Sequence, residues 1–352
     1  MTQQTNIEDQ TKPPILLLDG GLGTTLGEPP YSVSYNNSTP LWSSHLLISS
    51  PETLQSVHRS FARAGADILL SATYQASYEG FAKTPRLDAN SGPGYSKDEA
   101  TSYMRLAITL AAKASASVAK RSPPAVALSL GAYGAILIPS QEFSGFYPAD
   151  MTDEHVLAAW HKHRLEVFKQ DAVTWDQIEY VAFETVRPLT EIRGIRRAVF
   201  DVGKKWWISH VVPERAEESD IPAVVTAMLG SDKDLAIPWG IGINCTAVEK
   251  VDQVENMYRE TIRERFPEML GKLWFVLYPD GTRGEKYDSE SMSWVKDDNS
   301  VLTEPWEDIV MRVVETARAS GVWKGIIVGG CCKTLPKDIK MLRKCVDPLL
   351  NI

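Results

Sequence analysis

Several features are scarce or missing in this 352-residue sequence, and each narrows the class of protein. No apolar run approaches the roughly 20 residues that a membrane-spanning helix needs, so no membrane partner is expected. The first residues, MTQQTNIEDQTKPP, contain no apolar core, so we expect neither a signal nor a transit peptide, and we predict a disordered lead-in over residues 1–13. Positive charge is not in excess, because the net charge is −8, which argues against a nucleic-acid partner.

Cysteine is also scarce, with four residues in the whole chain, two of them adjacent. This number and spacing do not make a disulfide framework, so we expect a reducing compartment and a cytoplasmic location.

Nucleotide-binding loops are missing as well. The glycine-rich stretch at 19–27, DGGLGTTLG, has neither G-x-G-x-x-G nor the Lys-Ser/Thr of a P-loop. Its glycines instead free backbone N–H groups that can hold a small anion such as a carboxylate.

What the sequence does contain is a repeated alternation of apolar strands and helical segments. Strands that are apolar on both faces are typical of a parallel sheet covered by helices. The eight predicted strands are 15–21, 66–74, 125–134, 179–186, 205–212, 238–246, 272–281 and 325–332. Eight such units predict a single α/β domain over residues 14–352, a (β/α)8 barrel of the TIM type; a doubly wound open sheet is the alternative. A long polar loop is expected after the seventh strand.

In such a barrel the chemistry lies at the C-terminal ends of the strands. The eighth strand ends in GGCC, and the sulfurs of Cys331 and Cys332 can converge only if the chain leaves strand geometry there, which Gly329 and Gly330 would permit. Cys245 ends the sixth strand, one strand away. Three thiolates from two strands predict a Zn²⁺ site with an open fourth position. An iron–sulfur site, a thiol site or simply packed cysteines are the alternatives.

Two acidic residues, Asp19 and Glu184, also end predicted strands. A pair of carboxylates there could perform acid–base chemistry or bind a substrate ammonium group. The alternative for each is a helix-capping role. Cys345 lies in the last predicted helix without a partner, so it is not expected to bind the metal.

Taken together, four motifs resemble those of the homocysteine S-methyltransferase family. They are DGGLGTTL (19–26), SATYQAS (71–77), GINCT (242–246) and VGGCC (328–332), and the resemblance extends from Leu16 to Leu350. The compact size is similar to that of the members that use S-methylmethionine or S-adenosylmethionine. The resemblance implies an enzyme that transfers a methyl group from such a sulfonium donor to homocysteine and forms methionine, as a monomer or small homo-oligomer.

The resemblance also implies roles for individual residues. Zn²⁺ would be held by Cys245, Cys331 and Cys332, with Tyr74 at or near the fourth position when substrate is absent. Other family positions that the sequence matches would bind homocysteine: Asp19 and Glu184 its amino group, the backbone of Gly21, Leu22 and Gly23 its carboxylate, with Asn244 beside the first ligand.

Two stretches depart from the family pattern, namely GAYGA after the third strand and YPDG after the seventh. Both concern contacts to the methyl donor rather than to the metal. Alternatives to the leading function therefore stay open at this point. They are a betaine- or corrinoid-dependent homocysteine methyltransferase and a non-catalytic barrel that binds a thiol or zinc.

Overall fold

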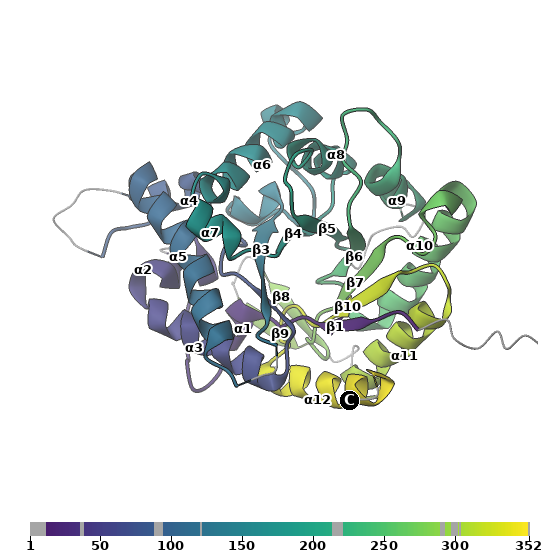
Figure 1. The fold of residues 1–352 in the computed structure, drawn as a ribbon. Helices are drawn as coiled ribbons and strands as arrows, with labels where there is room; N and C mark the ends of the chain where they lie inside the picture. The colour runs from purple at the N-terminus through teal and green to yellow at the C-terminus, as the bar shows by residue number, and fades with distance from the viewer. Residues whose placement is uncertain are drawn as a thin grey trace, which may run out of the picture.

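The computed structural model describes residues 12–35, 39–87, 94–119, 122–212, 221–288, 293–296, 302 and 304–350. Eight parallel strands stand in the middle of the molecule and helices surround them (Figure 1). The strands are β1 (Ile15–Leu17), β2 (Ile68–Leu70), β3 (Ala125–Gly131), β4 (Tyr180–Val186), β5 (Lys205–His210), β6 (Gly240–Asn244), β7 (Trp274–Tyr278) and β10 (Gly325–Val328). All eight predicted strands are therefore confirmed. The predicted lead-in lies outside the described residues up to position 11.

The sheet closes on itself. Its hydrogen-bonded order is β1-β10-β7-β6-β5-β4-β3-β2, and Leu18 bridges to Ile68, so β1 also meets β2. Two backbone hydrogen bonds complete this seam, from Asp19 to Ile68 at 3.1 Å and from Asp67 to Leu17 at 2.6 Å. The predicted (β/α)8 barrel is thus confirmed and the open sheet is excluded. In this order β6 and β10 flank β7, as the cysteine prediction required.

Helices follow or link the strands. They are α1 (Leu22–Gly27), α2 (Leu46–Ser49), α3 (Pro51–Ala64), α4 (Tyr78–Lys83), α5 (Lys97–Ala116), α6 (Glu154–Lys169), α7 (Ala172–Asp176), α8 (Leu189–Ala198), α9 (Ile221–Leu229), α10 (Val251–Arg265), α11 (Trp306–Ala319) and α12 (Pro336–Val346). Local sequence explains their ends. For example, α3 begins with Pro51 at its first position and stops at Gly65, whose φ of 116° suits glycine. Among the described residues no helix is both long and apolar enough to cross a bilayer.

The polar loop predicted after β7 contains an antiparallel hairpin that the sequence did not indicate. Its strands are β8 (Glu285–Asp288) and β9 (Ser293–Lys296). The sequence there, EKYD and SWVK, has too few apolar residues to signal a strand by burial. The two strands pair with each other in a sheet that is separate from the barrel.

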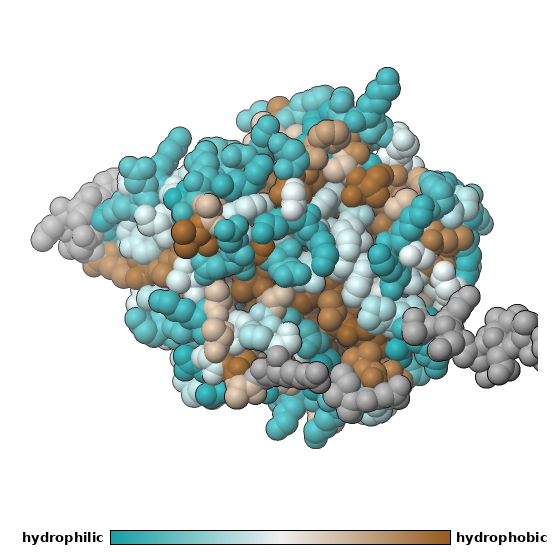
Figure 2. Space-filling view, viewed as in Figure 1, coloured by the Kyte–Doolittle hydropathy of each residue, from teal (hydrophilic) through white to brown (hydrophobic). Residues whose placement is uncertain are grey.

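The apolar residues form two clusters. The larger one lies between the barrel and the helices, and the smaller one fills the barrel with Leu18, Ile68, Ala127, Tyr180, Ala182, Trp207, Val276, Tyr278 and Ile327. Side chains alternate between the two along each strand, as strand geometry demands. Hydrophilic side chains dominate the surface over the helices, and hydrophobic ones show between them (Figure 2).

Candidate metal and substrate site

The barrel interior changes from apolar to polar near the C-terminal ends of its strands. Because side chains two positions apart share a face, Glu184 follows Tyr180 and Ala182 into the barrel. Ser129 donates a hydrogen bond to the Oε1 atom of Glu184, and the hydroxyl of Tyr278 is also hydrogen-bonded to Glu184. The carboxyl group is therefore presented at the barrel mouth by strand alternation, not by a helix cap.

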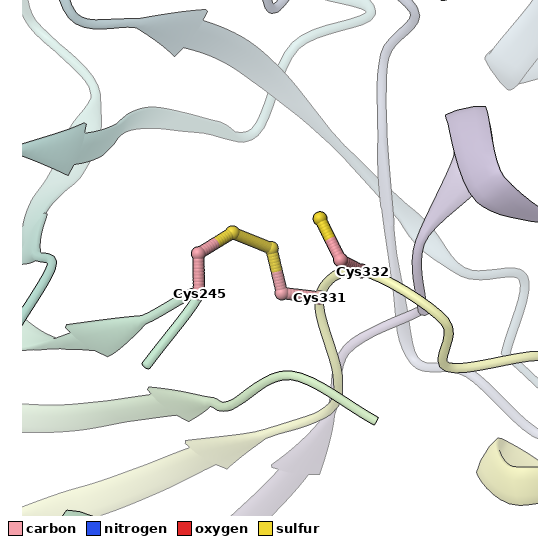
Figure 3. A group of neighbouring side chains, drawn as sticks. All are labelled: Cys245, Cys331 and Cys332. Atoms are coloured by element: carbon pink, nitrogen blue, oxygen red, sulfur yellow. A yellow bond between two sulfur atoms is a disulfide. The ribbon is translucent and has the colours of Figure 1, made fainter. Parts of the chain in front are cut away.

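The three predicted metal ligands come together at this end of the barrel. The sulfur atoms of Cys245, Cys331 and Cys332 all lie within 4.8 Å of one another. Cys245 directly follows β6, while the adjacent pair lies in the turn after β10, and the three side chains point toward one another (Figure 3). Each of the three residues is partly exposed.

Two residues at the cysteine site, Cys245 and Lys333, have positive φ angles, whereas Gly329 and Gly330 do not. Cys245 itself has a φ of 46°, in the left-handed region, and Lys333 has a φ of 59°. Gly329 and Gly330 are needed for a different reason. A Cβ atom on Gly329 would lie 2.7 Å from the Asp19 carbonyl oxygen, and one on Gly330 would lie 2.2 Å from the side chain of Thr334. The glycines thus permit close packing of the turn, which corrects the expectation that they supply unusual backbone angles.

The segment after β7 joins the two cysteine-bearing turns. Cys331 donates its backbone N–H to the carbonyl of Pro279 at 2.8 Å, and Gly281 donates to the carbonyl of Cys332 at 2.7 Å. The backbone N–H of Cys245 donates to the last residue of β7 at 3.2 Å. Three successive strand ends therefore hold the sulfurs in place, which favours a preformed site.

Two of the cysteines are close enough to be joined. A disulfide links Cys245 to Cys331, with their Cα atoms 5.3 Å apart, whereas Cys332 and Cys345 are free. The number and spacing of the cysteines predicted no disulfide framework, and this single pair arises because the barrel brings together two residues 86 positions apart in the sequence. A disulfide occupies two of the three sulfurs, so only the reduced chain can offer three thiolates to a metal.

The donor set fits a soft divalent metal such as Zn²⁺. Three thiolates are a known catalytic pattern, and the sulfurs already lie close to one another without any ion. Burial, followed by the negative charges of Asp280 and Glu142, raises the pKa of the Cys332 thiol to about 12. A cation is therefore needed to hold this residue as a thiolate near neutral pH. Cys345 lies in α12 and is not part of the group.

Two buried carboxyl groups accompany the cysteines. Asp19 is fully buried; its Oδ2 atom accepts a hydrogen bond from the backbone of Leu70 at 2.9 Å, while its Oδ1 atom has no partner. Burial raises the pKa of Asp19 well above its usual value, and the charge of Glu184 adds to this. Burial also raises the pKa of Glu184 to about 7. Both acids therefore hold their protons more readily than exposed carboxyl groups, and a cation bound beside them would favour their ionised forms.

A hydrogen-bonded chain connects three strand ends beside these acids. The hydroxyl of Tyr74 is bonded to the side chain of Thr185, which accepts a hydrogen bond from Asn244 Nδ2 at 2.7 Å. Asn244 Oδ1 in turn accepts the backbone N–H of Thr185 at 2.8 Å. Thr185 thus engages both the amide nitrogen and the amide oxygen of Asn244, and this pair positions the strand ends around the site. A substrate contact by Asn244 stays a prediction.

Tyr74 lies among the negative groups of the site. Burial raises the pKa of its phenol well above the usual value, and Glu142, Glu184 and Cys332 contribute through their charges. The buried guanidinium of Arg164 supports this strand end by donating to the backbone carbonyl of Tyr74 at 3.0 Å. The effect of Cys332 indicates that Tyr74 lies near the cysteines, and its occupation of the fourth metal position stays a prediction.

The turn after β1 contains the predicted carboxylate-binding backbone. The N–H of Gly21 is already used, because it donates to the carbonyl of Thr334 at 3.0 Å. Leu22 and Gly23 are in the first turn of α1, where backbone N–H groups have no acceptor within the helix. Of the three predicted residues, therefore, Leu22 and Gly23 retain N–H groups that could meet an anion.

Sequence reasoning gave no role to Ser129, Thr185 or Glu142. Ser129 was detectable as the one polar residue in the strand AVALSLG, whose alternation places it inside the barrel. Thr185 lies next to a predicted acid, but its φ of 58° is unusual for a β-branched residue and has no sequence signal. Glu142 lies in a long irregular loop, where periodicity gives no direction for a side chain.

Known proteins are similar to this chain in sequence and in fold. The family model for homocysteine S-methyltransferase matches residues 16–346. Homocysteine S-methyltransferase 4 of Zea mays is 28% identical over 341 residues, covering 94% of this chain and 89% of the relative. Betaine-homocysteine S-methyltransferase of Drosophila melanogaster is 30% identical over 352 residues, covering 96% and 95%.

A solved structure agrees with these sequence relatives. The metallated form of the homocysteine methyltransferase MmuM from Escherichia coli superposes with a TM-score of 0.67 at 25% identity, covering 94% of this chain and 96% of that one. The match of the family model over nearly the whole length, together with the shared barrel, is sufficient for assignment. The chain therefore belongs to the homocysteine S-methyltransferase family of enzymes.

Proposed function

We propose that this enzyme transfers a methyl group from a sulfonium donor, S-methylmethionine or S-adenosylmethionine, to the thiolate of homocysteine, and that it needs Zn²⁺ to do so. The observation that carries the proposal is the meeting of three cysteine sulfurs within 4.8 Å of one another beside two buried acids. One part of this site suits a soft metal and a thiol, and the other suits an ammonium group, so together they suit a thiol amino acid.

The residues of the chain would bind the acceptor at both ends. The ammonium group of homocysteine would meet Asp19 and Glu184, where it supplies a partner for the unpartnered Oδ1 atom of Asp19. Its carboxylate would meet the N–H groups of Leu22 and Gly23. These contacts direct the thiol toward the cysteines, and fixing its orientation lowers the entropic part of the barrier.

Cys245, Cys331 and Cys332 would hold the metal in the reduced enzyme. When bound, Zn²⁺ favours loss of the proton from a coordinated thiol and so keeps a thiolate available near neutral pH. The lone pair of the homocysteine sulfur forms a bond to the methyl carbon while the bond from that carbon to the donor sulfur breaks. The electron pair stays on the donor, which leaves as a neutral thioether and therefore needs no acid catalyst.

Tyr74 would close the site when homocysteine is absent. Its hydroxyl is already held by Thr185, and the charge of Cys332 acts on it, so it lies beside the cysteine group. Binding of the acceptor thiol then requires the Tyr74 side chain to move away from its position beside the cysteines. Such a residue keeps the site ordered between turnovers.

One assay separates the candidate functions. Reduced, zinc-loaded enzyme is incubated with homocysteine and, in parallel, with S-methylmethionine, S-adenosylmethionine, betaine or methylcorrinoid, and methionine is measured. We expect methionine with a sulfonium donor and its loss after treatment with a chelator. Turnover with betaine or methylcorrinoid alone would assign a different donor. No methionine with any donor would favour a barrel that binds zinc or a thiol without catalysis.

A further inference from the structure

Glu142 is a buried acid in the site that the mechanism above does not use. It lies in the loop between β3 and α6, and only 7% of its surface is exposed. Ser140 is hydrogen-bonded to this carboxyl group, but the Oε2 atom is buried without a hydrogen-bond partner, and among the described residues no lysine, arginine or histidine forms an ion pair with it. Burial raises the pKa of Glu142, so its ionised form costs free energy that a bound cation would offset.

Glu142 lies close to Tyr74. Its backbone packs against Gly134, and the ring of Tyr74 packs against Gly131, three residues earlier in the chain. The negative charge of Glu142 helps to raise the pKa of Tyr74, to which the charge of Glu184 also contributes. The site therefore contains a third buried acid besides Asp19 and Glu184.

The loop holds the backbone of Glu142 firmly. A Cβ atom on Gly134 would lie 2.5 Å from the backbone nitrogen of Glu142, so the loop packs directly against that glycine. Gln141 donates its backbone N–H to the carbonyl of Gly134 at 2.8 Å. Gln75, next to Tyr74 in the sequence, donates its side-chain amide to the carbonyl of Ala135 at 2.8 Å. The position of Glu142 is thus linked directly to the strand end that carries Tyr74.

A second anchor holds both ends of the same loop. The buried carboxylate of Glu191, in α8, accepts the backbone N–H of Tyr133 at 2.6 Å and the hydroxyl of Tyr147 at 2.5 Å. It also pairs with His161 in α6 at 2.9 Å. With its ends and its middle fixed, the loop presents Glu142 in a preformed position, which is how a binding residue is prepared for its ligand.

We propose that Glu142 binds the positive charge of the methyl donor, an onium cation in which sulfur or nitrogen carries the methyl group; this rests on the proposed function. Metal binding is a poorer explanation, because the donor atoms that lie within 4.8 Å of one another are those of the three cysteines and do not include Glu142. Binding of the acceptor is also a poorer explanation for Glu142, because Asp19 and Glu184 already provide two acids for the ammonium group of homocysteine in the proposed function. A methylated onium centre donates no conventional hydrogen bond. It therefore suits the Oε2 atom of Glu142, which has no hydrogen-bond partner.

The charge on the donor changes during the reaction, and this determines how Glu142 would act. A thiolate and an onium cation react to give two neutral molecules, so the positive charge diminishes toward the transition state. Glu142 therefore stabilises the bound donor at least as much as the transition state. By this reasoning it contributes to donor affinity and selectivity rather than to the chemical step, and the neutral product loses its attraction and can leave.

The test is the isosteric substitution Glu142→Gln in the full-length, reduced, zinc-loaded enzyme. We expect the KM for S-methylmethionine to rise by roughly tenfold to a hundredfold, the range lost when a charged partner is removed from a buried pair. The KM for homocysteine, the zinc content and kcat should stay near those of the wild type. Asp150→Asn is the matched control, because it removes an exposed charge from the same loop and should change none of these.

Calorimetric binding of S-methylmethionine without homocysteine gives a second readout that does not depend on turnover. We expect Glu142→Gln to weaken it by the same factor. Unchanged donor affinity in a folded Glu142→Gln enzyme would overturn the inference, and so would a loss of zinc or of homocysteine affinity in place of donor affinity. The absence of methionine formation by the wild type would instead contradict the proposed function, while the calorimetric comparison would still decide the role of Glu142.

Discussion

Asn244 and Thr185 form two hydrogen bonds with each other across the barrel mouth, at 2.8 Å to the backbone and 2.7 Å to the side chain of Thr185. These two bonds hold Thr185 at a φ of 58°, a conformation that a β-branched residue rarely adopts. Thr185 in turn holds the hydroxyl of Tyr74 and directly follows Glu184 in β4. One pair of side chains thus positions both a predicted substrate-binding acid and the predicted occupant of the metal site.

Replacing Asn244 by Ala should therefore affect both stability and activity. The buried N–H of Thr185 loses its acceptor, so we expect unfolding to require about 1–3 kcal/mol less free energy. We also expect a higher KM for homocysteine, because Glu184 and Tyr74 lose their support. Thermal unfolding and steady-state kinetics measure the two effects. Thr185→Ser keeps the hydroxyl and should stay close to the wild type; equal losses in both variants would show that the hydrogen bonds are not responsible.

The cysteines should divide into two classes. Cys245→Ala, Cys331→Ala and Cys332→Ala should each lose bound zinc and activity, because two remaining sulfurs do not hold the ion tightly. Cys345→Ala is the control, since this residue lies in α12 outside the group, and it should keep both. Metal analysis and the methionine assay on all four proteins provide the measurement. Full activity in any of the first three variants contradicts the metal assignment.

Oxidation should compete with metal binding. In the oxidised chain the disulfide between Cys245 and Cys331 leaves two of the four cysteines as thiols. We expect this form to contain no stoichiometric zinc and to regain it after a thiol reductant and Zn²⁺ are added. Titration of free thiols alongside metal analysis follows the change. A protein that keeps one zinc per chain with only two titratable thiols would exclude this competition.

Glu184 should give the enzyme a pH dependence near neutrality. Its pKa of about 7 in the fold exceeds the value of an exposed glutamate, so the folded state binds more protons than the unfolded chain between about pH 4.5 and 7. Stability should consequently fall as the pH rises through this window, while affinity for the homocysteine ammonium group rises as the carboxyl group ionises.

The substitution Glu184→Gln tests both effects. It should flatten the stability profile over that window and raise the KM for homocysteine at pH 8, while zinc content stays unchanged. Unfolding free energies measured from pH 4.5 to 8, with metal analysis of the same samples, check this. Loss of zinc in a folded Glu184→Gln protein would make the acid part of the metal's support instead.

The substitution Tyr74→Phe tests whether the Tyr74 hydroxyl occupies the fourth position of the zinc site when homocysteine is absent. The variant keeps the ring but loses the hydroxyl, so we expect zinc to be held less tightly without homocysteine and normally with it. In the wild type, X-ray absorption at the zinc edge should show one additional sulfur neighbour at ~2.3 Å when homocysteine is added. An unchanged sulfur count in an active, saturated sample would mean that the thiol is activated in another way.

The sequence alone determined the barrel and which cysteines meet. Apolar strands such as GIIV and WFVLY are dictated by local composition and alternate with amphipathic helices, so eight repeats are visible without coordinates. Strand ends in a closed parallel barrel meet on one face, which is why Cys245 could be paired with the GGCC turn 86 residues later.

Only the tertiary structure decided how the remaining groups act. The φ of Thr185, the unpartnered oxygens of Asp19 and Glu142, and the use of the Gly21 N–H by Thr334 all depend on neighbours from other strands. Backbone angles, burial and hydrogen-bond partners of this kind arise from contacts between residues far apart in the chain. Periodicity and composition are local properties, and they contain no information about which distant group fills a given position.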